Sequence, residues 1–332
     1  MYIVDYLPRL GTLSINMDVA DRSAKISRVS LIGPNEFMVE LGSTRYKIDL
    51  PISITDNNTK ITQLISKDGS LSIKMNVGSE INESFMNHLI DSDLQKWSVK
   101  DLLSKTSINP ESQKNEFRFL CHGCNASIID STQANFRDMP SELWYEMMDF
   151  WHCHKPHNPS FIHDKNYQHL APQAGEVYIG TSYLMTTLDP KCVCGEILGK
   201  NNKIFKWNLK LSYNDTIETY PLYLYVYYNL LDKINSTAGR NFKVVNKSDD
   251  KSLNIWTVGV GLKVSISGIK LENCLKILYD DTYDSNDFEE IVLEDDIFLQ
   301  FLQRLDYIND KLPDRSKVIE IKSINRKISY LG

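Results

Sequence analysis

Cys121-His122-Gly123-Cys124 and Cys192-Val193-Cys194-Gly195 are two short cysteine pairs that lie far apart in the chain. In the first pair, a two-residue spacer lets one turn point both sulfurs at the same ion. The glycine in or directly after each pair permits the close backbone approach that such turns need. Because four thiolates suit one tetrahedral zinc, we expect these four cysteines to hold a structural zinc.

Two other interpretations of the cysteine pairs stay open. The second pair has a spacer of only one residue, which is less usual, and the thiols could also be free and reduced or form a disulfide or redox pair. A closed four-thiolate site has no open position for water or substrate, so a zinc here would hold the fold together rather than perform chemistry. We therefore look for function elsewhere in the chain.

Composition narrows the class of protein. The chain has 332 residues, 42% hydrophobic and 24% charged, which is ordinary for a globular protein, and its net charge of -6 argues against broad binding to nucleic-acid phosphates. No apolar run approaches the roughly 20 residues of a membrane span, and the first residues do not follow the signal-peptide pattern. We expect an intracellular protein without direct nucleic-acid or membrane partners. A reducing compartment disfavours disulfides and strengthens the zinc interpretation.

Periodicity predicts an α+β protein. Alternation and turn residues predict a β-rich N-terminal barrel or sandwich with strands at 11–17, 24–31, 36–41, 45–50, 60–66 and 70–75, followed by a helix over 84–104. The last part reads as mixed α/β, with strands at 203–213, 241–245, 254–267 and 317–331 and helices over 220–234 and 295–309. We expect acidic stretches such as 289–296 to be solvated surface or helix-start charge.

Domain boundaries follow from these segments. We expect a β-rich domain over 1–110, a zinc-binding central region with one helix over 111–200, and an α+β domain over 201–332. The centre holds five of the six cysteines and six of the seven histidines, so chemistry is concentrated there.

A helix is predicted between the two cysteine pairs, over 138–154. Asp138 or Ser141 can cap it, and a proline suits its first turn. Its aromatic and methionine stripe is most simply core. Cys153 falls across from that stripe among carboxylates, at the helix end, where a thiolate is disfavoured unless a neighbouring histidine is protonated.

Three roles stay open for Cys153 and His154. They could replace one of the four thiolates as zinc ligands, cap a metal presented by a partner, or simply lie at the surface. A further hypothesis is that the protein is itself a metalloenzyme. No HExxH or comparable spacing supports it among the histidines concerned, which are His152, His154, His157, His163 and His169.

The order of these motifs resembles a known family. CxxC at 121–124, PSExWxExxDxWxCH at 140–154 and CxCGxxLG at 192–199 resemble the HECT-like ubiquitin-conjugating-enzyme-binding family. The resemblance implies a nuclear and cytoplasmic ubiquitin ligase that partners a ubiquitin-conjugating enzyme. The fungal members are associated with mRNA cleavage and polyadenylation, which implies a second partner, the metallo-β-lactamase-type pre-mRNA endonuclease.

Two hypotheses about function follow from the resemblance. A thioester ligase needs a cysteine that carries ubiquitin, and Cys153 is the candidate because Cys274, the only late cysteine, lies in an apolar context typical of a buried thiol. Alternatively, the chain is a zinc-stabilised binding or assembly factor that presents Trp151, Cys153 and His154 to the endonuclease. The sequence does not decide between these two hypotheses, so it stays open whether the protein is an enzyme, namely a ubiquitin-protein transferase.

Overall fold

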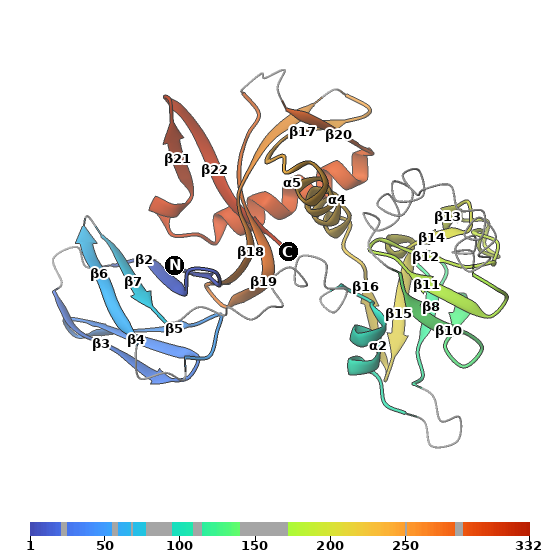
Figure 1. The fold of residues 1–332 in the computed structure, drawn as a ribbon, viewed down its shortest axis with the longest axis horizontal. Coiled ribbons are helices and arrows are strands. Elements are labelled where there is room, and N and C mark those ends of the chain that lie inside the picture. Colours follow the sequence, from blue (N-terminus) through green and yellow to red (C-terminus); the bar gives the residue numbers. More distant parts are fainter. Residues whose placement is uncertain are drawn as a thin grey trace, which may run out of the picture. The chain divides into compact units, whose positions relative to one another are not determined.

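The computed structural model describes residues 1–20, 25–54, 59–67, 69–77, 95–108, 115–139, 172–249, 251–282 and 288–332. The chain divides into two compact units (Figure 1). Unit 1 comprises Met1–Leu89 and Thr237–Gly332, and unit 2 comprises Ile90–Ser236. The boundaries of these units differ from those of the three consecutive domains expected above, because strands from both ends of the chain pair in one sheet. The three-domain division stays a prediction.

Unit 1 contains a ten-stranded sheet. Eight strands follow in the order β21 (Val318–Ile321), β22 (Ile324–Leu331), β19 (Ile269–Asp280), β18 (Ser252–Ile266), β1 (Tyr2–Leu7), β2 (Thr12–Asp18), β7 (Ser70–Asn76) and β6 (Lys60–Lys67). Off this path, β17 (Asn241–Asn246) pairs antiparallel with β18 and parallel with β20 (Glu289–Leu293). Pairing of β1 with β18, which places Ile3 opposite Ile266, joins the two ends of the chain.

A second sheet in unit 1 consists of β3 (Ile26–Gly33), β4 (Glu36–Leu41) and β5 (Thr44–Asp49). Buried side chains of β1, β2 and β7 share one core with those of β4 and β5, and along β2 every second residue is buried, as expected for a strand with one face on a core. Two sheets therefore pack on one core. Of the barrel and the sandwich predicted here, the barrel is wrong for the described strands, because none of their sheets closes on itself.

The other face of the large sheet packs against α5 (Asp295–Asp310). Ile308 at the end of α5 and Leu312 just after it lie in a core with Ile3 and Tyr330. Asp295 and Asp296 occupy the first turn, where the helix dipole favours acids. The predicted helix over 295–309 and its acidic start are confirmed, although the acidic stretch before it is strand β20.

Unit 2 contains two further sheets. One has the order β10 (Asn135–Asp138), β11 (Glu176–Ile179), β12 (Tyr183–Met185), β14 (Lys203–Phe205) and β13 (Gly199–Lys200). The other has the order β16 (Thr216–Thr219), β15 (Leu209–Tyr213), β8 (Arg118–Cys121) and β9 (Ser127–Asp130). The described residues of this unit include the helices α2 (Val99–Lys105) and α4 (Tyr223–Thr237), and the short η4 (Lys206–Asn208) separates β14 from β15. In the five-stranded sheet, β10 pairs parallel with β11 whereas the other pairs are antiparallel, so this sheet is mixed.

Three helices, α2, α4 and α5, lie in the described part of the chain, which is otherwise rich in strands. The six predicted N-terminal strands and the helix over 220–234 are confirmed within a few residues. Strands β1, β19 and β20 of unit 1 and strands β8 to β13 and β16 of unit 2 were not predicted. In the described part of the chain, no helix has the length and apolar character to cross a membrane.

Several predicted boundaries are wrong. Of the helix expected over 84–104, residues 84–94 lie outside the described residues, and α2 begins only at Val99, because the Ser98 hydroxyl caps it by accepting the Asp101 amide at 3.1 Å. Asp138, one of the two residues expected to cap the helix over 138–154, is the last residue of β10; the other candidate, Ser141, and the helix itself lie outside the described residues. Instead of one strand over 317–331, β21 and β22 form a hairpin around Lys322 and Ser323, whose positive φ suits a two-residue turn.

Candidate metal centre

The four predicted cysteines come together in unit 2. The Sγ atoms of Cys121, Cys124, Cys192 and Cys194 all lie within 4.8 Å of one another. The Sγ atoms of Cys121 and Cys194 are 3.9 Å apart, and those of Cys124 and Cys192 are 3.4 Å apart. Four thiolates at zinc–sulfur distances of about 2.3 Å around a tetrahedral ion would be about 3.8 Å apart. The cluster therefore has the dimensions of a tetrahedral metal site.

The first pair sits on a turn at the end of β8. Cys121 pairs with Leu209 of β15, which fixes where the turn begins. The Cys121 carbonyl accepts the Asn125 amide at 3.0 Å, and the Cys121 amide donates to the Ala126 carbonyl at 2.8 Å. The His122 amide donates to the Asn208 carbonyl at 2.9 Å. Backbone bonds thus hold Cys121 and Cys124 on one side of a tight turn.

The second pair sits on a loop that leads into β13. The Gly195 amide donates to the Cys192 carbonyl at 2.9 Å, and the Cys192 amide donates to the Glu196 carbonyl at 2.8 Å. Gly195 has a φ of +93°, which favours glycine and closes the turn. Leu198 donates its amide to the Pro190 carbonyl at 2.7 Å, which closes the base of the loop. The glycine that follows the second pair is therefore required by the turn itself.

Burial differs across the cluster and bears on the state of the thiols. Cys121 and Cys192 are buried, whereas Cys124 and Cys194 are exposed. A backbone hydrogen bond from Cys194 lowers the pKa of the Cys192 thiol, but burial and the three neighbouring thiols outweigh it and raise this pKa to about 12. Without a metal, Cys192 is therefore protonated at neutral pH.

These residues fit a structural zinc. All four ligand atoms are thiols, the ligand set that proteins use for closed structural sites, and they come from two loops far apart in sequence. A zinc bound here would be held by Cys121, Cys124, Cys192 and Cys194 and would cross-link the turn after β8 to the loop before β13. The prediction that these cysteines converge is supported by their geometry, and zinc as the ion stays a prediction.

Cys274 lies apart from the cluster, in β19 of unit 1. Its side chain is fully buried, and burial raises the pKa of its thiol well above the usual value. A protonated, inaccessible thiol is a poor nucleophile. This agrees with the structural role expected from its apolar sequence context.

The other predicted site residues lie outside the described residues. These are Trp151, Cys153 and His154 together with His152, His157, His163 and His169. Their roles as nucleophile, partner contact or metal ligand stay predictions.

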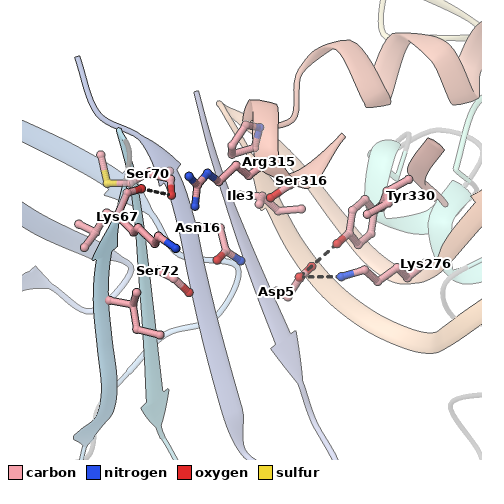
Figure 2. A pocket seen from close by; sticks show the side chains of 15 residues that line it. Ile3, Asp5, Asn16, Lys67, Ser70, Ser72, Lys276, Arg315, Ser316 and Tyr330 are labelled. Atoms are coloured by element: carbon pink, nitrogen blue, oxygen red, sulfur yellow. Dashed lines mark hydrogen bonds and ion pairs between the residues drawn. The ribbon is translucent and has the colours of Figure 1, made fainter. Parts of the chain in front are cut away.

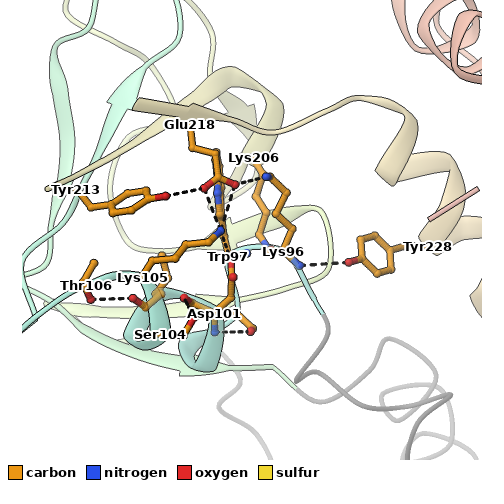
Figure 3. A network of polar contacts seen from close by, with 12 residues as sticks. Lys96, Trp97, Asp101, Ser104, Lys105, Thr106, Lys206, Tyr213, Glu218 and Tyr228 are labelled. Atoms are coloured by element: carbon orange, nitrogen blue, oxygen red, sulfur yellow. Dashed lines mark hydrogen bonds and ion pairs between the residues drawn. The ribbon is translucent and has the colours of Figure 1, made fainter. Parts of the chain in front are cut away.

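A polar network in unit 2 was missed by sequence reasoning (Figure 3). The Glu218 carboxylate of β16 forms ion pairs with the Lys96 ammonium and, at 3.0 Å, with the Lys105 ammonium. Lys105 also pairs with Asp101 at 2.8 Å. Burial raises the pKa of Glu218, but the two ammonium groups outweigh it and lower this pKa below its usual value. The network ties the segment before α2 to the edge strand of the four-stranded sheet.

Comparison with known proteins places the chain in a family. Residues 5–323 match the family described as HECT-like ubiquitin-conjugating enzyme (E2)-binding. The chain belongs to this family. It is also similar to the uncharacterized protein YJR141W of Saccharomyces cerevisiae, with 24% identity over 354 aligned positions that cover 96% of each chain. No solved structure matches the chain.

Proposed function

We propose that this chain binds a ubiquitin-conjugating enzyme and acts as a ubiquitin-ligase-like protein. The observation that carries the proposal is the family match over nearly the whole chain. The cysteine cluster supports a structural rather than a chemical role for a metal held there, because a four-thiolate site leaves no open coordination position.

A contact surface for the conjugating enzyme is offered by the second cysteine loop. Val193 is 93% exposed and Ile197 is 72% exposed, the two highest values among the large apolar side chains of the described residues. Single exposed apolar residues are common, but two on one short loop that is closed at its base form a preorganised anchor. We assign Val193 and Ile197 to the contact with the conjugating enzyme.

Transfer of ubiquitin would require a reactive cysteine. Cys274 is buried and protonated, and the other four described cysteines form the cluster. Within the proposal, Cys153 is therefore the residue that would attack the ubiquitin thioester, with Trp151 and His154 beside it in sequence. The alternative is a non-catalytic assembly factor that offers the same three residues to the pre-mRNA 3′-end endonuclease, in the nucleus and cytoplasm.

The first experiment tests binding. A panel of purified ubiquitin-conjugating enzymes is titrated against wild type, Val193→Asp and Ile197→Asp, with Val292→Asp in unit 1 as the control for an exposed apolar residue elsewhere. We expect at least one enzyme to bind wild type and the control alike, and to bind both loop variants about tenfold or more weakly at unchanged metal content. If no enzyme binds wild type, the proposal is wrong.

The second experiment separates transfer from binding. Wild type and Cys153→Ser are mixed with a conjugating enzyme charged with ubiquitin and analysed with and without reductant. Transfer predicts a reducible ubiquitin adduct on wild type that the variant lacks. The assembly-factor alternative predicts no adduct on either protein and loss of endonuclease capture by Cys153→Ser.

A further inference from the structure

The four cysteines of the cluster differ in exposure, and each of the two loops carries one cysteine of each kind. Cys121 in the first loop and Cys192 in the second are buried, whereas Cys124 and Cys194 are exposed. The oxidation of a cysteine follows its exposure and its thiolate character. An oxidant in the solvent therefore reaches one sulfur of each loop first.

Each exposed sulfur is in contact with a buried sulfur of the other loop. The Sγ atom of Cys124 lies 3.4 Å from that of Cys192, and the Sγ atom of Cys194 lies 3.9 Å from that of Cys121. These two contacts use each of the four cysteines once, and they join residues 68 and 73 positions apart in sequence. A second sulfur thus already stands beside each sulfur that an oxidant would modify.

The backbone of the second loop favours disulfides between the loops over a disulfide within it. A bond between Cys192 and Cys194 would close a ring of only three residues. The turn there is fixed by the Gly195 amide, which donates to the Cys192 carbonyl at 2.9 Å, and by the positive φ of Gly195. Disulfide geometry is specific, and a pair that distorts the backbone stores strain. If Cys192 and Cys194 do not pair with each other, oxidation of all four cysteines has to link the two loops.

The chemistry of the first pair needs one molecule of hydrogen peroxide. In a metal-loaded cluster the ligand sulfurs are thiolates. The Cys124 thiolate attacks one peroxide oxygen, the O–O bond breaks, and a sulfenic acid and hydroxide form. The Cys192 thiolate then attacks the Cys124 sulfur, the S–O bond breaks, a second hydroxide leaves, and the disulfide forms. The two sulfurs together lose the two electrons that the peroxide gains.

The same steps at Cys194 and Cys121 consume a second peroxide and produce a second disulfide. No thiolate of the cluster is then left to hold a metal, so a bound zinc is released. The two disulfides join the same two loops that the metal joins, and a disulfide that closes a long loop stabilises the folded chain. Oxidation therefore exchanges one cross-link for another.

We propose that the cysteine cluster is a reversible oxidation site, at which hydrogen peroxide attacks Cys124 and Cys194, and Cys192 and Cys121 of the opposite loops resolve them as disulfides with release of the metal. The exposed cysteines are the points of attack, and the buried cysteines are the resolving partners. The inference concerns the cluster alone and does not rest on the contact assigned above to the conjugating enzyme.

The first test maps the disulfides in the full chain. Wild type and Cys153→Ser, which removes a cysteine that is not one of the four, are reduced, loaded with zinc and treated with hydrogen peroxide. A chromophoric chelator follows zinc release, and mass spectrometry of unreduced digests identifies the linked residues. We expect both proteins to release about one zinc per chain for about two peroxides consumed, and to contain the pairs Cys121–Cys194 and Cys124–Cys192. Reduction by a thiol should restore zinc binding. Any other pattern of pairs, or zinc that stays bound under peroxide, would overturn the proposal.

Two further measurements test the roles of the buried and exposed cysteines. In Cys121→Ser, Cys194 has lost its resolving partner, so dimedone should trap a sulfenic acid at Cys194 that it does not trap in wild type. Because this variant also loses a metal ligand, urea unfolding of wild type supplies an independent readout. Oxidised, metal-free wild type should unfold at higher urea concentration than reduced wild type stripped by a chelator. Equal unfolding of these two forms would show that the disulfides do not replace the cross-link of the metal.

Discussion

The ammonium of Lys206 donates to the main-chain carbonyl of Lys96 at 2.8 Å in the interior of unit 2. The Lys206 side chain is fully buried, and its nitrogen lies 5.6 Å from the centre of the Tyr220 ring. Burial lowers the pKa of Lys206 well below 10.5, although the carboxylates of Asp138 and Asp101 oppose this. A buried lysine of this kind makes stability depend on pH.

The sign of that dependence can be predicted. Between the lowered pKa of the folded state and 10.5, the unfolded chain binds more protons at Lys206, so this residue makes stability rise with pH across that window. Lys206→Met should remove this contribution and flatten the profile, at a cost of about 1–3 kcal/mol for the orphaned carbonyl of Lys96. Urea unfolding of both proteins from neutral pH to 10.5 measures it, and parallel profiles would show that Lys206 does not titrate in this range.

Gly199 should not tolerate a side chain. A Cβ at this position would lie 1.8 Å from the Lys203 carbonyl oxygen and 2.8 Å from Ile204 Cα, and backbone atoms of a paired strand cannot move away cheaply. We expect Gly199→Ala to separate β13 from β14, to lower the free energy of unfolding by about 1–3 kcal/mol or more, and to weaken metal retention by the loop that precedes β13. Gly33→Ala is the control, since its Cβ would meet only the Glu36 side chain at 3.8 Å. Equal melting temperatures of the two variants would contradict the prediction.

Removal of one thiol should release the metal. Cys124→Ser leaves three thiols in the cluster, and we expect it to lose stoichiometric zinc and to unfold unit 2 at lower urea concentration, because structural zinc stabilises only the folded state. Cys274→Ala, outside the cluster, should keep the metal. Elemental analysis after dialysis distinguishes them. Zinc uptake by the stripped wild type should also release protons to the buffer, and metal content that is unchanged in Cys124→Ser would exclude the four-thiolate site.

A buried ion pair in unit 1 gives a prediction about coupling. Arg326 Nε lies 3.3 Å from Asp280 Oδ2, both side chains are at least nine-tenths buried, and the guanidinium lies 4.2 Å from the centre of the Trp256 ring. Arg326→Met should cost about 3–5 kcal/mol, because it leaves the Asp280 carboxylate buried without its cation. Adding Asp280→Asn should recover part of this loss. A double-mutant cycle with strictly additive costs would show that the two groups do not interact.

Sequence alone determined those features that depend on local spacing and periodicity. The CxxC spacing and the glycine after Cys194 predicted the cysteine turns, because a turn is specified by the few residues that form it. Alternating burial in β2 and the amphipathic pattern of α5 were likewise readable, since one face of each element packs on a core. The motif order also identified the family.

Only the tertiary structure decided how distant segments combine. It joined β1 to β18, so that both ends of the chain form unit 1, and it brought Asp5 to Lys276 and Tyr330 at a cavity that no motif marks (Figure 2). It also placed Asp138, one of the two residues expected to cap the central helix, in β10, where its carboxylate accepts the Val99 amide at 2.8 Å. Strand pairing and the burial of charged groups depend on which residues meet across long sequence separations, and local patterns carry no information about that.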